Sequence, residues 1–333
     1  MIRIIALAVS VLLVSCTCQS QQPGAGSAAV SAETDKVSTA APLSAEAKLN
    51  AETIRNLLAQ GELREGITQA YALSQQYPES IEAGLILASA YTLAERYGDA
   101  VRTADRVLSL DADVVGAWVT HGAALRGLGR TEEAMASTLQ ALALDADNPG
   151  ALANLARLYG DQNELEQQAE ILNKLVKIAP EDANARLALS QNKGQQGDLQ
   201  GALNDAVRAS KVDPQNLESH VYQAVTLFSL KRYHQAMEHA EVALRIDADE
   251  PVALEIFRNA YYLSMAVRLI CKHGAGPWSR QQIRQEINTG DFPLKALPGV
   301  LEFESLQQEF AVRTSSQKRI AEAAAACGAQ SRE

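Results

Sequence analysis

Short segments that end helices recur along this chain at a constant interval. Each is a residue pair such as Tyr77-Pro78 or Asp213-Pro214, and the second residues stand at positions 78, 112, 146, 180, 214 and 248. All five intervals are therefore 34 residues, with no insertion. A fixed period of this size is typical of proteins in which each repeat is one small structural unit that packs on its neighbours. The period therefore predicts a solenoid of equal units.

Small residues keep the same register inside the units. Twelve residues before each stop lie Gly66, Ala100, Ala134, Gln168, Ala202 and Ala236. Twenty-four residues before the stops from 112 onward lie Ala88, Gly122, Ala156, Ser190 and Ala224. Antiparallel helices approach within about 8–10 Å at such points, where a large side chain would push them apart. A chain that is 47% hydrophobic but only 5% aromatic also suits close-packed helices better than strands. We therefore expect an all-α fold.

This pattern resembles the tetratricopeptide repeat (TPR), which places two helices in 34 residues. The unit at 115–148 matches with Trp118, Gly122, Gly129, Ala134 and Ala141, the unit at 149–182 with Leu152, Leu155, Ala156, Tyr159 and Pro180, and the unit at 217–250 with Ala224, Tyr233, Ala236 and Ala243. Gln168 replaces the usual small residue, and Lys193 replaces the usual aromatic residue or leucine. The resemblance implies about six repeats and a capping helix over 46–270, followed by a helical tail over 271–333.

Local signals mark where the helices of each unit begin and turn. Ser80, Asn148, Asp182 and Asn216 stand where the first helix of a unit needs an N-cap. Gly129 and Gly197 mark the turn between the two helices of a unit.

The N-terminus has the layout of a secretory signal. One positive charge, Arg3, precedes an apolar run from Ile4 to Val14, which is too short to span a bilayer as a helix. The run ends at Ser15-Cys16 and resembles the lipobox of bacterial lipoproteins, in which residues 1–15 are removed and Cys16 receives lipid, including palmitate. An ordinary signal peptide with an incidental cysteine is the alternative. Thr17 in place of aspartate implies sorting to the outer membrane, facing the periplasm. Residues 16–45 then form a flexible linker, since they contain almost no large apolar side chains.

The cysteines suggest one disulfide. If Cys16 carries lipid, the thiols of Cys18, Cys271 and Cys327 remain in an exported protein exposed to oxidation. Our hypothesis is a Cys271–Cys327 bond that ties the tail to the end of the solenoid. The alternative is a pair of buried, unpaired thiols.

First helices line the concave face of TPR proteins, and the same projection here gives a polar middle and an aromatic C-terminal end. The expected partner-binding residues are Thr120, Asn154, Arg157, Asn184, Gln191, Tyr222, Phe228, Asn259 and Tyr262. A solvated inner face, with its aromatic residues packed against neighbouring helices, is the alternative. The carboxylate clamp of some TPR proteins needs lysine where this chain has Leu85, Val119, Ala153, Leu187 and Val221, so we expect no such clamp.

The sequence contains little that indicates nucleic-acid binding, metal binding or catalysis. A net charge of −10 argues against nucleic-acid partners. The Asp-Ala-Asp runs at 111, 145 and 247 lack the glycine and distant glutamate of a calcium loop, and their recurrence with the repeat indicates turns. His234 and His239 are five residues apart and do not share a helix face. No nucleophile motif or phosphate loop is present, so we expect neither enzyme, metal nor cofactor.

These observations favour a scaffold or adaptor that binds envelope proteins or peptides, of the kind used in pilus or secretin assembly or with peptidoglycan enzymes. The alternative is a lipoprotein that carries or senses a small ligand or glycan with its C-terminal segment. The oligomeric state does not follow from the sequence.

Overall fold

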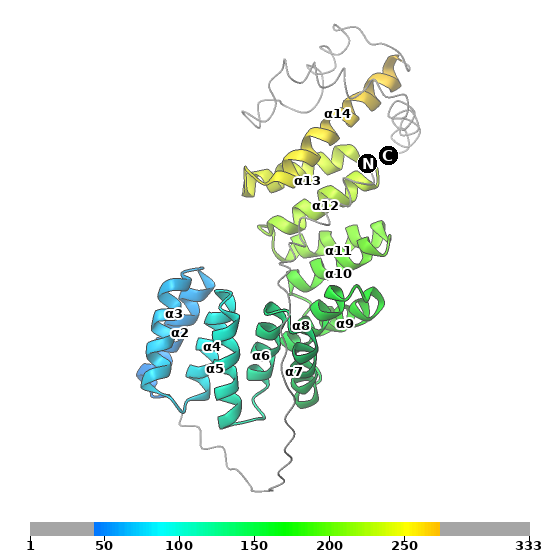
Figure 1. Cartoon of the computed structure of the whole chain (residues 1–333). Coiled ribbons are helices and arrows are strands. Elements are labelled where there is room, and N and C mark those ends of the chain that lie inside the picture. The colour runs from blue at the N-terminus through cyan, green and yellow to red at the C-terminus, as the bar shows by residue number, and fades with distance from the viewer. Residues whose placement is uncertain (1–42, 274–333) are drawn as a thin grey trace. The chain divides into compact units, whose positions relative to one another are not determined.

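The computed structural model describes residues 43–273, and within them the chain forms thirteen α-helices and no strand (Figure 1). The six pairs are α2 (Ala45–Ala59) and α3 (Leu63–Gln76), α4 (Ile81–Leu93) and α5 (Tyr97–Leu110), α6 (Val115–Gly127) and α7 (Thr131–Leu144), α8 (Pro149–Asp161) and α9 (Leu165–Ile178), α10 (Ala183–Gln195) and α11 (Leu199–Val212), and α12 (Leu217–Ser229) and α13 (Tyr233–Ile246). A longer helix, α14 (Pro251–His273), follows them. The predicted all-α fold of helix pairs is confirmed.

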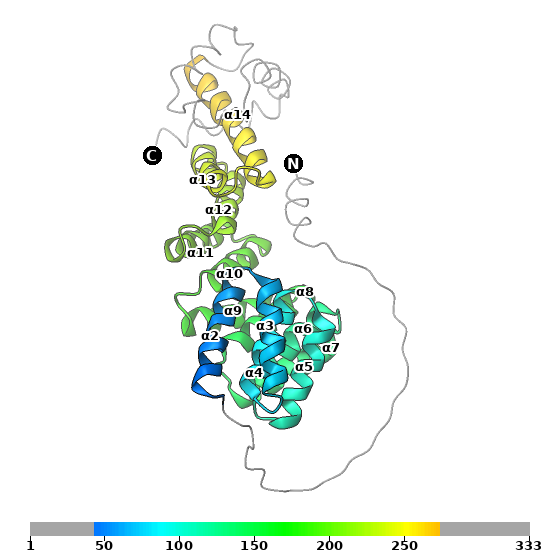
Figure 2. The same ribbon diagram turned by 90° about the vertical axis from the view of Figure 1, so that its left-hand side faces the viewer.

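The helices fall into two compact units, residues 1–151 and 152–333, with the division inside α8. In the first unit, successive helices from α2 to α7 contact one another. In the second, successive helices from α9 to α14 contact one another (Figures 1 and 2). First helices also contact one another, since α4 lies against α2 and α6, and α12 lies against α10 and α14. Each unit is therefore a stack of helix pairs with first helices side by side.

The predicted N-caps are confirmed at all four positions. The side chain of Ser80 accepts a hydrogen bond from the Ala83 amide at 3.3 Å, and Asp182 accepts one from Ala185 at 3.0 Å. Asn148 and Asn216 do the same for the amides three residues later, at 3.1 and 2.8 Å. These bonds satisfy amides that have no partner within the helix, so each of these four repeats carries its own start signal.

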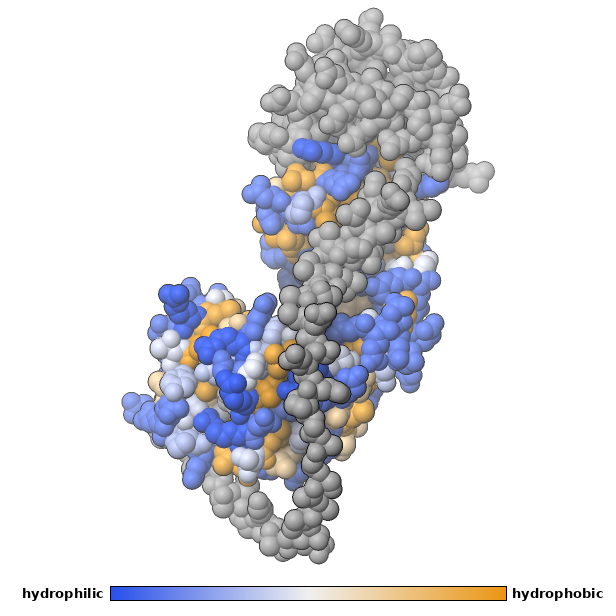
Figure 3. All heavy atoms as spheres, viewed as in Figure 1, coloured by the Kyte–Doolittle hydropathy of each residue, from blue (hydrophilic) through white to orange (hydrophobic). Residues whose placement is uncertain are grey.

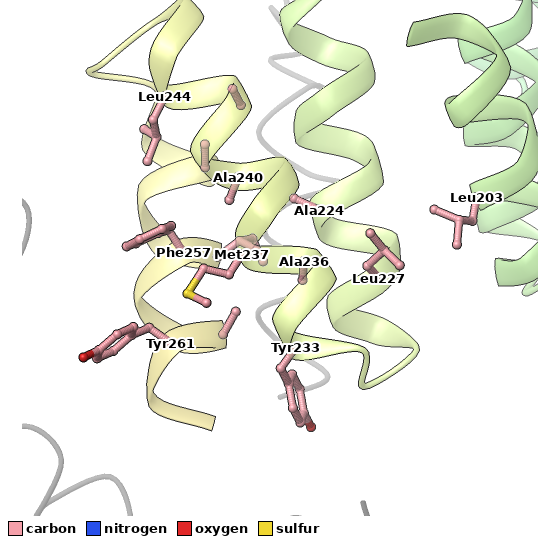
Figure 4. Close-up of a cluster of buried hydrophobic side chains, with 14 residues drawn as sticks. Leu203, Ala224, Leu227, Tyr233, Ala236, Met237, Ala240, Leu244, Phe257 and Tyr261 are labelled. Carbon is pink, nitrogen blue, oxygen red and sulfur yellow. The ribbon is translucent and has the colours of Figure 1, made fainter. Parts of the chain in front are cut away.

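Small residues permit the close helix contacts, as the register predicted. A Cβ placed on Gly122 of α6 would lie 2.8 Å from Thr138 Oγ1 and 3.3 Å from the Ala134 carbonyl oxygen of α7. At the end of the second unit, alanines of α12 and α13 lie beside larger side chains such as Met237 and Phe257, which are 1% and 8% exposed (Figure 4). Burial of this apolar cluster stabilises the contact between α13 and α14.

The turn inside each repeat uses a left-handed backbone at a recurring position. Positive φ angles occur at residues 61, 95, 129, 163, 197 and 231, which are 34 residues apart. The predicted turn glycines Gly129 and Gly197 are confirmed, with φ of 73° and 87°. Glu95, Asn163 and Lys231 take the same conformation. The sequence did not predict these turn positions, because none of them is glycine, the residue that favours positive φ.

Because a side chain such as lysine is strained at positive φ, Lys231→Gly is expected to raise the free energy of unfolding by about 0.5–1 kcal/mol. Lys231 is exposed, with φ of 64°, so little packing is lost. Urea unfolding followed by circular dichroism measures the change. Lys231→Ala is the control, since it removes the same side chain but keeps the strain. An equal gain from both variants would contradict the backbone explanation.

Candidate functional site

The candidate binding surface of the second unit lies on the first helices α10, α12 and α14. In α12, buried residues such as His220, Gln223 and Ala224 face the second helices. The remaining positions recur every three or four residues and point to the other side. We call this side the first-helix face, made of Asn184, Ala188, Gln191, Glu218, Val221, Tyr222, Val225, Phe228, Glu255 and Asn259.

The structure separates the predicted binding residues into distinct groups. Asn184 and Arg157 are exposed, and Gln191 and Asn259 are half-buried, so their polar groups reach the surface. Asn154 is only 5% exposed and offers a partner almost no surface. Thr120 belongs to the first unit, and its hydroxyl donates to the Gly116 carbonyl at 2.9 Å.

Three other sequence predictions lie outside the described structure. The side chains of Tyr262 and Cys271 are not among the described parts of α14. Cys16 and Cys327, with the proposed signal, residues 16–42 of the proposed linker and the tail beyond His273, lie outside residues 43–273. The lipid anchor and the disulfide therefore stay predictions. The predicted boundaries differ slightly from the structure, because Ser44 already caps α2 and α14 continues to His273.

Tyr222 packs against the preceding repeat. Its hydroxyl lies 3.4 Å from the Ser190 carbonyl oxygen and 3.5 Å from that of Gln191. A Cβ on Gly194 would lie 2.0 Å from the same hydroxyl, so the glycine makes room for the tyrosine. Burial raises the pKa of Tyr222 to about 12, which keeps the phenol neutral. Tyr222 thus joins α12 to α10, and only part of its ring remains for a partner.

The Phe228 ring also packs partly against a residue of its own repeat. Its ring meets that of Tyr233 edge-on, with centroids 5.5 Å apart and an interplanar angle of 61°. Val221 and Val225 pack against the same core and are half-buried. The apolar part of the first-helix face therefore consists mainly of two valines and the free edge of Phe228.

The polar part of this face consists of amides and carboxylates. Asn184, Gln191 and Asn259 carry amides, which both donate and accept hydrogen bonds. Glu218 and Glu255 are exposed and acidic. Amides beside apolar strips suit an extended peptide, whose backbone also offers both donors and acceptors.

The two departures from the repeat pattern make polar contacts between helices. Gln168 Oε1 accepts a hydrogen bond from Asn192 Nδ2 at 2.8 Å. Lys193 Nζ lies 2.5 Å from Asp205 Oδ2, and the Asp205 side chain is only 4% exposed. Lys193 is thus engaged with α11.

An Asp–His–Ser chain joins three helices of the first unit, which the sequence did not reveal because its members are 16 residues apart. His121 Nε2 lies 3.1 Å from Asp105 Oδ1, and His121 Nδ1 lies 2.9 Å from Ser137 Oγ. Ser137 is only 4% exposed and also lies 2.9 Å from the Glu133 carbonyl oxygen. With its hydroxyl buried, this chain is placed to hold α5, α6 and α7 together rather than to attack a substrate.

A pair of stacked histidines, His220 buried and His239 half-buried, lies in the second unit. The rings of His220 and His239 stack with centroids 5.9 Å apart, and His220 Nε2 lies 3.1 Å from the Pro214 carbonyl oxygen. The Nδ1 atom of each ring is buried without a hydrogen-bond partner. Burial lowers the pKa of His239, His220 adds to the lowering, and Glu238 opposes it. Burial also lowers the pKa of His121, against the opposing effect of Asp105.

Stability is therefore expected to fall as the pH drops below about 6.5. The unfolded chain takes up protons near the ordinary histidine pKa of 6.5, whereas folded His121 and His239 take them up only at lower pH. The unfolded state then binds more protons, and acidification favours it. Urea unfolding at pH 7.5 and 5.5 measures the loss. His239→Gln should reduce this pH dependence, and an unchanged dependence would remove His239 from the explanation.

The Asp-Ala-Asp runs form turns, as predicted. Asp111, Asp145 and Asp247 each accept a hydrogen bond from the amide two residues later, at 2.9, 3.2 and 3.1 Å. In the described part of the chain, no three His, Cys, Asp or Glu side chains are grouped as a metal site needs. Within residues 43–273, no helix combines the length and apolar character that a bilayer crossing requires.

Comparison with known proteins defines the class. Family models for the tetratricopeptide repeat match residues 115–148, 149–182 and 187–251. The chain is thus an all-α helical-repeat protein with the TPR fold, and the repeats within residues 115–182 and 187–251 match the tetratricopeptide repeat. TPR domains are scaffolds that bind proteins or peptides. No curated protein matches the sequence.

Solved structures share the fold at low sequence identity. The APC/C hetero-tetramer Cut9–Hcn1 aligns with a TM-score of 0.59 at 14% identity, over 64% of this chain but only 42% of that one. Pseudomonas aeruginosa PilF aligns with a TM-score of 0.52 at 15% identity, over 63% of this chain and 95% of that one. The TPR protein TTC0263 of Thermus thermophilus gives 0.51 at 18%, over 55% and 99%. These likenesses support the fold.

Proposed function

We propose that this protein is a lipid-anchored TPR scaffold on the periplasmic side of the outer membrane, which binds partner proteins during envelope assembly. The observation that carries the binding role is the first-helix face, where the amides of Asn184, Gln191 and Asn259 accompany half-buried Val221 and Val225. The lipobox at Cys16 supports the anchor and Thr17 the outer membrane.

We propose two envelope roles for such a scaffold. The first is pilus or secretin assembly, and the second is that of an adaptor for peptidoglycan enzymes. The fold shared with PilF is compatible with the first. The alternative function, a carrier or sensor of a small ligand or glycan, depends on residues 271–333, which lie almost wholly outside the described structure.

Site-specific crosslinking in the native cell tests the binding role. A photo-crosslinking residue at Gln191 should capture a defined set of envelope proteins, and adding Val225→Glu should abolish the capture, because a charge there would disrupt the apolar strip. The same crosslinker at Asn204, exposed on second helix α11, is the matched control and should not capture that set. Equal capture from both positions, or capture that survives Val225→Glu, would reject the first-helix face as the binding surface.

Cell fractionation tests the anchor separately. Cys16→Ala should release the protein from the outer-membrane fraction, since a lipid cannot be attached to alanine. The protein that keeps Cys16 should be found in the outer membrane. Its recovery in the inner membrane would overturn the proposed location while leaving the binding role intact.

A further inference from the structure

The outward side of α7 differs from the same side of the other second helices. Position by position in the 34-residue register, α7 carries Ala136, Leu139 and Ala143 there, and all three are exposed. The corresponding exposed positions are polar in α5 (Arg102, Asp105, Ser109) and in α9 (Glu170, Asn173, Lys177). A helix on the surface of a soluble protein normally presents polar residues to water. The α7 stripe, defined as Ala136, Leu139 and Ala143, is therefore an unpartnered apolar face.

The spacing of the α7 stripe fits a helical partner. Residues at i, i+3 and i+7 lie along one side of a helix, as in the seam of a two-helix contact. Leu139 is 50% exposed and stands between two alanines, whose small side chains permit a close approach. Leu144, at 37% exposed, extends the apolar surface at the end of α7. Figure 3 shows apolar and hydrophilic residues side by side on the surface of the first unit.

The charges at both ends of the α7 stripe are mainly acidic. Glu132 and Glu133 are exposed in the first turn, and Asp145 and Asp147 are exposed just after the last. Arg130 is the basic side chain at the N-terminal end, and it pairs with Glu133 at 2.5 Å. An occupant of this surface therefore meets negative charge at either end.

This charge pattern disfavours a second copy of the chain. An antiparallel copy centred on Leu139 would set Glu133 of one chain against Asp145 of the other. A parallel copy would set each acidic residue against itself. Like charges placed together oppose association, whereas a helix with lysine or arginine at its flanks is complementary.

We propose that the α7 stripe is a second docking surface, separate from the first-helix face, and that it binds an amphipathic helix of another protein whose apolar stripe is flanked by lysine or arginine. Such a scaffold holds one partner on its first helices and another on the outside of α7.

Two synthetic helical peptides test this proposal. Both carry the same leucine and alanine stripe, one flanked by lysine and the other by glutamate, and each bears a fluorescein label. Fluorescence anisotropy measures binding to the chain from residue 16 onward carrying Cys16→Ala, which lacks both the lipid and the apolar signal segment. The lysine peptide should bind at least tenfold more tightly than the glutamate peptide, and its affinity should fall between 50 and 300 mM NaCl.

Matched variants locate the binding. Leu139→Gln should weaken binding of the lysine peptide at least tenfold. Circular dichroism should show an unchanged fold, because Leu139 is exposed. Asn173→Ala, at the equivalent position of α9, and Val225→Glu, on the first-helix face, should leave binding unchanged. The proposal is overturned if the lysine peptide does not bind, if both peptides bind equally, or if Val225→Glu rather than Leu139→Gln abolishes binding. It is also overturned if sedimentation shows a dimer that Leu139→Gln dissociates, since the occupant is then a second copy.

Discussion

Lys193→Leu is expected to lower the free energy of unfolding by about 3 kcal/mol, although leucine fits the repeat pattern better than lysine. Lys193 Nζ lies 2.5 Å from Asp205 Oδ2, and the Asp205 side chain is 4% exposed. The other cation nearby, Arg208, lies 3.6 Å from Asp205 Oδ1 and is itself 65% exposed. Removing Lys193, which is itself 30% exposed, leaves the buried Asp205 carboxylate with only the more distant Arg208 as a partner. Loss of one member of a fully buried pair costs about 3–5 kcal/mol, so we expect the lower end of that range.

The double variant separates this charge effect from packing. Lys193→Leu with Asp205→Ala removes both charges and restores leucine at the position where Leu125 and Leu227 stand in other repeats. We expect its free energy of unfolding to lie within about 1 kcal/mol of the unmodified protein, because replacing a buried pair by apolar residues is often nearly neutral. Urea unfolding of the two single variants and the double variant gives the coupling energy. If Lys193→Leu alone is neutral, or if the two substitutions are additive, the ion pair does not stabilise this repeat.

The sequence predicted the features of the fold that depend on local or periodic information. The 34-residue register predicted the helix pairs, and short-range rules predicted caps such as Ser80 and Asp182, whose partners are three residues away. The Lys193–Asp205 pair was not predictable in the same way, because its members are 12 residues apart on different helices. Only the packing of α10 on α11 brings their side chains together.

The candidate site was predictable in part for a related reason. Helical periodicity placed Asn184, Gln191 and Asn259 on one side of the first helices, where their polar groups reach the surface. It could not show that Tyr222 packs over Gly194, because that contact depends on the distance between successive repeats. The outward α7 stripe also escaped notice, since alanine and leucine read as core residues until their exposure is known.

Gly122→Leu is expected to destabilise the first unit by about 3 kcal/mol, and Gly122→Ala by about 2 kcal/mol. A Cβ at this position would lie 2.8 Å from Thr138 Oγ1 and 3.3 Å from the Ala134 carbonyl oxygen. Thr138 is fully buried, and its hydroxyl donates to that same carbonyl at 2.8 Å, so neither group can move freely. The helices α6 and α7 must then separate.

Gly98→Ala on α5 is the control that makes the sign of this effect informative. A Cβ there would meet only Arg102 Nη1 at 3.9 Å, so alanine adds helix propensity without a clash. We expect Gly98→Ala to raise the free energy of unfolding by about 0.5 kcal/mol, in the direction opposite to Gly122→Ala. Thermal and urea unfolding of both variants measures the two changes. A neutral or stabilising Gly122→Ala would mean that α6 and α7 can adjust their spacing, and the small residues of the register would then not be required by close helix contact.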